Sequence, residues 1–166
     1  MRAHPVRQVT VPAAARALST LCRIDYADAF LVDTGAAQDR TAEQWARLIL
    51  QDAPITVRTR LLAGWSLIGL KLGNGRSGRP VLGWELRASI PEFALLGADS
   101  RIGMPGELLF KRTQGALLFC TFVQQDNHIA RAVWATIEAV HVRVVRDVLE
   151  QAIGRLRSPR QAGGES

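Results

Sequence analysis

The sequence predicts an α+β fold in which a curved antiparallel sheet wraps around one long C-terminal helix. In the stretch 129–153, apolar residues recur at three- and four-residue steps, which is typical of an amphipathic helix. From residue 81 onward, short segments alternate apolar and polar residues, which is typical of half-buried strands. A sheet that curves around the long helix is the compact way to bury both apolar surfaces.

Length and composition fit one globular domain. The 166 residues are 48% hydrophobic and 22% charged, and no apolar run is long enough to cross a bilayer. Residues 1–18 are basic but lack a continuous apolar segment, so we expect no signal peptide and a cytoplasmic location. We expect residues 1–156 to form the domain, with 1–11 as an extended arm, and 157–166 to be a disordered tail.

Charge and cysteine content argue against two other classes of protein. A net charge of +6 would suit a nucleic-acid-binding protein, but the arginines are scattered and do not interleave with aromatic residues as on a base-stacking surface. We therefore do not expect nucleic acid as a partner. Cys22 and Cys120 cannot form a disulfide framework, and Cys120 lies in an apolar run, which indicates a core residue.

The first half of the chain carries clear helix and turn signals. Pro12 stands at a favourable first helical position, Thr41 and Gln44 form a capping-box pattern, and Pro54 ends the helix that this box begins. Glycines then mark a loop. In chain order these signals predict a helix, a strand, two helices and a loop, over 12–21, 26–33, 41–53, 55–72 and 73–80.

The second half predicts an antiparallel meander before the long helix. Gln114-Gly115 supplies a hairpin turn, and Asp126-Asn127 caps the helix. The last strand, 116–124, is apolar on both faces, so we expect it to be covered on both sides, and its apolar surplus favours a homodimer. The strands are predicted over 81–90, 93–98, 100–104, 107–113 and 116–124, the second and third being two short strands or one bent strand.

This order of elements resembles the helix-grip fold of the START, Bet v-like and polyketide-cyclase (SRPBCC) superfamily. The segments DYADAF, LLGADSRIG and WATIEAVHVRVV look like a bacterial domain-of-unknown-function family within it, and together they span nearly the whole chain. That family often has Pro-Phe-His-Arg where this chain has Ala139-Val140-His141-Val142, so the histidine is kept and the arginine is not. The resemblance implies an apolar ligand held between sheet and helix, in either an enzyme or a binding protein.

His141 is the candidate catalytic residue. It lies on the apolar stripe of the long helix, one turn after Ile137 and one turn before Val145. An imidazole there faces the space between helix and sheet and can exchange a proton near neutral pH. The alternative is a buried histidine whose ring is satisfied by a backbone carbonyl or a water.

The aromatic balance of the chain suggests a pocket wall. Four Trp stand against one Tyr, and rigid indoles can line a site for a cyclic or conjugated ligand, although each could equally be core. Strand alternation allows either Trp84 or Glu85 to point inward, and we favour Trp84. The predicted substrate-binding residues are Trp65, Trp84, Met104, Phe122, Trp134 and Ile137.

One glycine motif and the metal-ligand residues lack the context of a functional site. The G-x-G-x-x-G match that begins at Gly73 follows a helix and precedes a strand, the reverse of a dinucleotide-binding motif. The three histidines and two cysteines have no metal-ligand spacing. We expect neither a metal nor a cofactor.

The first functional hypothesis is a pocket that binds an apolar, polyketide-like molecule and promotes its cyclisation by shape, with His141 moving a proton. The second is a non-catalytic carrier or sensor of a hydrophobic ligand. The third, a basic nucleic-acid binder, would show an affinity that falls steeply with salt.

Overall fold

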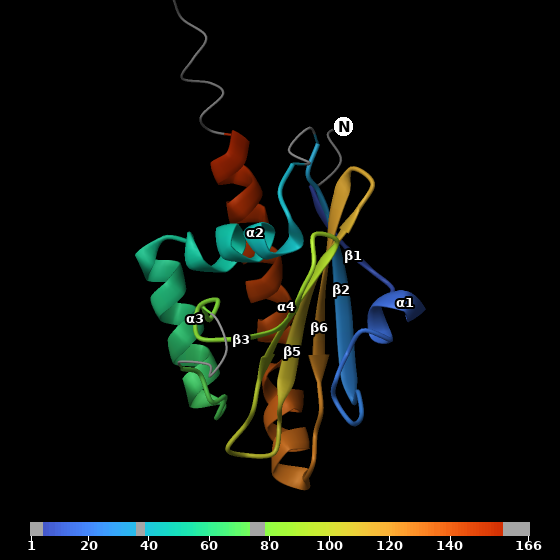
Figure 1. The fold of residues 1–166 in the computed structure, drawn as a ribbon. Helices are drawn as coiled ribbons and strands as arrows, with labels where there is room; N and C mark the ends of the chain where they lie inside the picture. Colours follow the sequence, from blue (N-terminus) through green and yellow to red (C-terminus); the bar gives the residue numbers. More distant parts are fainter. Residues whose placement is uncertain (1–4, 36–38, 74–78, 158–166) are drawn as a thin grey trace, which may run out of the picture.

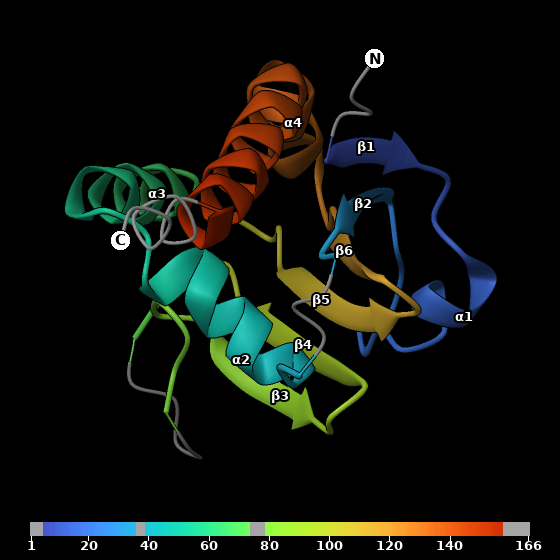
Figure 2. The ribbon, with the colours of Figure 1, turned by 90° about the horizontal axis from the view of Figure 1, so that it is seen from above.

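Six antiparallel strands form one curved sheet, and the long helix α4 (His128–Arg157) lies on its concave side, as Figures 1 and 2 show. The structure is a computed structural model and describes residues 5–35, 39–73 and 79–157. The predicted α+β helix-grip arrangement is confirmed. In sheet order β1-β2-β6-β5-β4-β3, the strands are β1 (Val6–Val9), β2 (Tyr26–Asp33), β6 (Ala116–Val123), β5 (Gly106–Thr113), β4 (Phe93–Ala98) and β3 (Glu85–Ser89).

The helices divide between the two sides of the sheet. On the concave side lie α2 (Ala42–Ala46), the π-helical turn η1 (Arg47–Gln51), α3 (Ile55–Leu67) and α4, whereas the single turn α1 (Ala13–Arg16) lies on the convex side (Figure 2). The side chain of Arg155 donates to the carbonyl of Leu48 at 2.9 Å, which ties the end of α4 to η1. Because helices lie on both sides, each face of the sheet packs on its own apolar cluster.

Strand alternation on β6 builds both clusters. Leu117 and Phe119 pack on the concave side with α4, while Leu118 and Cys120 pack on the convex side near α1. The prediction that this strand is covered on both sides is confirmed. The apolar surplus that favoured a homodimer is thus buried within the chain, and the homodimer stays a prediction.

Local sequence signals fix the helix ends. Thr41 and Gln44 form the predicted capping box, and the Asn127 side chain accepts from the Ala130 amide at 2.8 Å at the start of α4. Helix α3 begins after Pro54 as predicted but ends at Leu67 instead of Leu72. The reason is Gly69, whose φ of +83° lies in the left-handed region that a helix cannot continue through.

Three predicted segments differ from the structure, two of them because contacts with distant strands override the local pattern. The expected N-terminal arm contains β1, which pairs with β2 at the sheet edge. The expected helix over 12–21 is one turn only, and the following segment is held by Glu107 of β5. The expected strand over 100–104 is a series of bends, with Gly103 at a φ of +79°.

Strand β3 also begins later than predicted. Leu82 and Gly83 adopt positive φ, so the chain turns before Glu85. The predicted glycine-rich loop falls largely on 74–78 and the predicted tail on 158–166, which lie outside the described residues, whereas Arg157 is the last residue of α4. Within the described residues, no helix combines the length and the hydropathy that a membrane span requires.

Candidate functional site

A buried carboxylate lies on the concave face of the sheet, among apolar side chains. Alternation along β2 places Tyr26, Asp28 and Phe30 on the same face. The register of the sheet sets Asp28 directly opposite Thr121 of β6. Both residues are only 4% exposed, so a charged and a hydroxyl-bearing side chain are enclosed between the sheet and α4.

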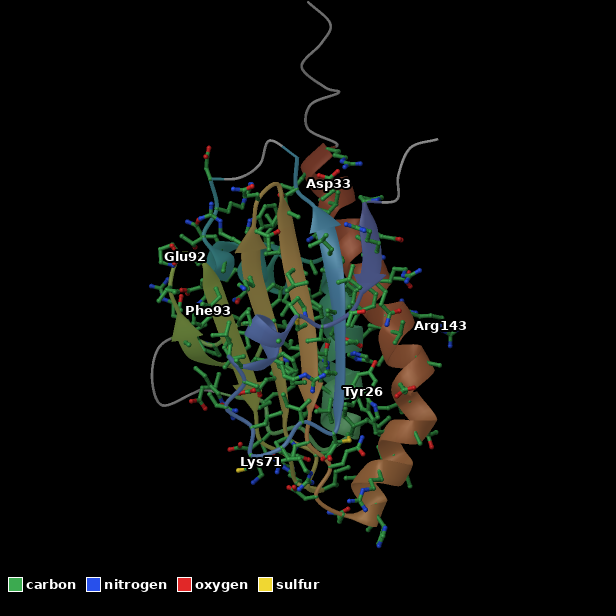
Figure 3. The ribbon with its side chains drawn as sticks, turned by 90° about the vertical axis from the view of Figure 1, so that its right-hand side faces the viewer. Tyr26, Asp33, Lys71, Glu92, Phe93 and Arg143 are labelled. Atoms are coloured by element: carbon green, nitrogen blue, oxygen red, sulfur yellow. The ribbon has the colours of Figure 1, made fainter. Side chains whose placement is uncertain are left out.

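His141 of α4 reaches this carboxylate. Its Nε2 lies 3.0 Å from Asp28 Oδ2, and the Tyr26 hydroxyl donates to the same oxygen at 2.7 Å. Figure 3 shows Tyr26 on β2 at the side that faces α4. Burial and the hydrogen bond to Asp28 raise the pKa of the Tyr26 phenol well above its usual range, so this phenol keeps its proton. The three side chains form one hydrogen-bonded cluster from two elements.

The cluster sets the roles of the two imidazole nitrogens. An ionised carboxylate can only accept hydrogen bonds, so His141 Nε2–H donates to Asp28. In the neutral ring Nδ1 is then the acceptor, and within the described part of the chain no group donates to it. A carboxylate that orients an imidazole in this way also stabilises the cation that forms when Nδ1 takes up a proton.

Indole rings enclose the cluster. The centroid of Trp134 lies 5.0 Å from that of His141 and 4.7 Å from that of Tyr26. Trp65 and Trp84 meet edge to face, with their ring centroids 5.4 Å apart. These contacts make a mostly apolar wall around the Asp28–His141 pair, and electrostatic interactions are stronger in such surroundings than in water.

Three hollows lie around His141, and Trp65 lines each of them as well. The first, of about 50 Å³, lies against η1 and the C-terminal half of α4, and the second, of about 50 Å³, lies against the sheet. The third is a groove of about 320 Å³ between α3 and α4, which falls within the range of small-molecule sites, roughly 300–1,000 Å³. A ligand of that size would lie in the groove and reach inward to His141.

The helix stripe predicted to be buried is partly open at this groove. Val140 is 49% and Val144 is 37% exposed, although both belong to the predicted apolar stripe of α4. These two valines are exposed because they face α3 across the groove, whereas Trp134 and Val148 pack towards the sheet.

Several buried polar atoms at the site have no hydrogen-bond partner among the described residues. Such atoms are uncommon in folded proteins, because each loses its hydrogen bonds to water without replacement. Trp84, Thr121 and Trp134 border the inner hollow beside His141. A ligand in this hollow could accept hydrogen bonds from the two indole N–H groups and bond to the Thr121 hydroxyl. The atoms are Asp28 Oδ1, Thr121 Oγ1, Trp84 Nε1 and Trp134 Nε1.

The structure brings most of the predicted site residues together. Trp65, Trp84, Met104 and Trp134 line the inner hollow with His141, and Ile137 lines the groove. Trp84 points inward with 3% exposure, whereas Glu85 is exposed, as the alternation argument favoured.

Phe122 is placed differently from the prediction. It borders the hollow, but its side chain packs in the convex cluster with Leu95 and Leu109. The reason is alternation, since Phe122 stands next to Thr121, which faces the concave side. Arg87 of β3 pairs with Glu107 on the convex side.

Sequence reasoning missed Tyr26, Asp28 and Thr121. A signal was present for the first two, because in YADAFLVD every second residue from Tyr26 shares a face with Phe30 and Val32. An acidic residue in the apolar register of a strand indicates a buried charge, which needs a partner. That partner is the histidine on the apolar face of α4.

Comparisons with known proteins do not assign a function to this site. Protein-family models, curated proteins and solved structures yield no match to this chain. The residues that the structure describes contain no group of three His, Cys, Asp or Glu side chains placed to hold a metal ion. Membership of the helix-grip cyclase superfamily stays a prediction from the sequence.

Proposed function

We propose that this protein binds an apolar, polyketide-like small molecule in the space between the sheet, α3 and α4 and promotes its ring closure by proton transfer. The observation that carries the proposal is the Asp28–His141 pair, with a buried carboxylate 3.0 Å from an imidazole inside an apolar wall. An oriented imidazole of this kind is a general base, and no cofactor is needed for the step.

The chemistry follows from the groups around the pair. His141 Nδ1 would remove a proton from the carbon next to a ligand carbonyl, and Asp28 would stabilise the resulting imidazolium. An indole N–H of Trp84 or Trp134, which has no hydrogen-bond partner among the described residues, would donate to the enolate oxygen. The carbanion would attack a second carbonyl of the folded chain, and the imidazolium would return its proton to the new alkoxide. The apolar wall would hold the reacting ends together.

A direct test measures proton abstraction separately from ring closure. We expect the protein to accelerate exchange of the α-protons of a flat aryl ketone, such as α-tetralone, for deuterium, as followed by proton NMR. His141→Ala should reduce the accelerated rate by about 100-fold or more, which is the usual contribution of a general base. Asp28→Asn should reduce it as well, because the ring loses its charged partner.

A matched control lies on the same helix. His128 is exposed at the first turn of α4, so His128→Ala should leave the exchange rate unchanged. Equal rates in the wild type and in folded His141→Ala would refute the proton-transfer proposal. Co-purification of an unchanged apolar molecule, identified by native mass spectrometry, together with no exchange, would favour the non-catalytic carrier instead.

A further inference from the structure

The groove between α3 and α4 is bordered by exposed side chains and shares lining residues with the inner hollow. The two helices run antiparallel and side by side (Figures 1 and 2). Leu67, which lines the groove, is 88% exposed, and Val140 across from it is 49% exposed. His141, Trp65 and Trp134 line both the groove and the inner hollow. His141 therefore borders both the exposed groove and the inner hollow.

One fixed charge borders this groove. Arg60 of α3 is the only arginine, lysine or acidic residue among its described lining residues. It forms no ion pair or hydrogen bond to another described side chain. Arg60 and Leu67 are seven residues apart on α3, so this wall is about 10 Å long at the 1.5 Å rise per residue of a helix. An apolar trough of that length with a free guanidinium at one end matches a chain-like molecule that carries a terminal anion.

Gly64 widens the groove at its middle. A Cβ built at this glycine would meet no atom within 4 Å, although the residue lies in the interior of α3 and lines the groove. Glycine weakens a helix here, and alanine would fit without contact. The open space beside Gly64 faces His141 and Val140 across the groove.

We propose that the groove admits an acyl chain with a terminal carboxylate, that Arg60 binds this carboxylate, and that the chain passes Gly64 to reach His141. This inference rests on the proposed function and narrows its substrate class from apolar molecules to anionic chain molecules. Guanidinium and carboxylate pair through directed hydrogen bonds, and Arg60 is free to make them. The apolar wall buries the chain.

The test titrates the full chain with decanoate and with decanol, following tryptophan fluorescence because Trp65 and Trp134 line the groove. We expect decanoate to bind more tightly than decanol. Arg60→Gln should weaken decanoate by about threefold, the effect of one partly exposed ion pair, and leave decanol unchanged. Gly64→Leu should weaken both ligands by about tenfold or more, because the added side chain fills the trough.

Two control variants match these changes outside the groove. Arg143→Gln removes the same charge from the outer side of α4, where Figure 3 shows this arginine, and Ala63→Leu adds bulk at an exposed position of α3. Both should bind decanoate as the wild type does. This comparison separates a local ion pair from the general attraction of a chain with net charge +6 for anions.

Each remaining result has a distinct meaning. Wild-type affinity for decanoate in Gly64→Leu would overturn the groove proposal, as would a wild-type dimer that this variant converts to a monomer, because the groove would then bind a second copy. Ketone exchange without binding of either decyl compound would overturn the groove proposal alone. Neither binding nor exchange would contradict the proposed function as well.

Discussion

Two buried carboxylates on opposite faces of the same sheet should respond differently to loss of charge. Glu107 is fully buried on the convex face and accepts from the hydroxyls of Ser19 and Thr20, from the Thr20 amide and from Arg87. Asp28 is buried on the concave face, where one of its oxygens has two partners and the other has none among the described residues. The first carboxylate is saturated and the second is not.

The magnitudes follow from these partners. In Glu107→Gln, the amide NH₂ must face either the Thr20 amide or the Arg87 guanidinium, both of which are donors. Losing one charge-assisted bond and leaving a donor unsatisfied should lower the free energy of unfolding by about 3 kcal/mol. At this chain length that corresponds to a melting temperature lower by about 6–12 °C.

Asp28→Asn should lower the free energy of unfolding much less than Glu107→Gln does. The asparagine oxygen can keep both existing hydrogen bonds, from Tyr26 and His141, and the NH₂ takes the unpartnered side. Weakening two charge-assisted bonds costs roughly 2 kcal/mol, and removing a buried charge returns a similar amount. We expect the free energy of unfolding to change by less than about 1 kcal/mol.

Urea unfolding followed by tryptophan fluorescence measures both changes, provided that the m-values agree. Asp99→Asn is a suitable control, because Asp99 is 74% exposed and its pair with Arg87 should contribute about 0.5 kcal/mol at most. A cost for Asp28→Asn equal to that of Glu107→Gln would refute the reasoning. Asp28 would then be a structural residue, and the argument for a catalytic pair would lose its basis.

Two further predictions concern titration near the site. Tyr26 is the only tyrosine, so the near-ultraviolet phenolate absorbance should stay absent in the folded protein at about pH 10 and appear there in urea. Because folding raises the pKa of Tyr26, this phenol loses its proton at a lower pH in the unfolded state than in the folded state. The free energy of unfolding should therefore fall above about pH 10, by up to 1.4 kcal/mol per pH unit. Ionisation of Tyr26 in the folded protein at about pH 10 would contradict this prediction. Burial, reinforced by Asp28, raises the pKa of Cys120 to about 12, so Ellman's reagent should modify only the exposed Cys22 in native protein and both thiols in urea. Rapid modification of two thiols in native protein would show that the convex cluster opens readily.

The elements that sequence predicted best are those whose signals are local. The strand 26–33, the strand 93–98 and the capping box at Thr41 depend on alternation or on contacts within four residues, and the structure places them as predicted. The one-turn helix α1 could not be predicted in this way. The chain after α1 leaves helical conformation because Glu107, 87 residues away, binds the Thr20 amide and hydroxyl.

The candidate site shows the same division. His141 and the three indoles could be found because each lies on an apolar stripe, but the partner of His141 depends on strand order. Asp28 meets α4 only because β2 lies beside β6 near the helix, a pairing of segments about 90 residues apart. Phe122 was misplaced because an uninterrupted apolar strand gives no alternation by which to choose a face.

Where α4 is anchored explains why the site lies at its middle. The buried residues of this helix lie near its two ends: Ala130 and Trp134 in the first turns, and Val148, Leu149, Ala152 and Ile153 in the last ones. From 135 to 147 no residue is buried, although Val142 and Val145 pack partly against the concave cluster and His141 bonds to Asp28. A helix packed closely along its whole length would leave no room for a ligand beside His141. Anchoring at both ends keeps the backbone of His141 in place, as proton transfer requires, while the space beside it stays open to the groove.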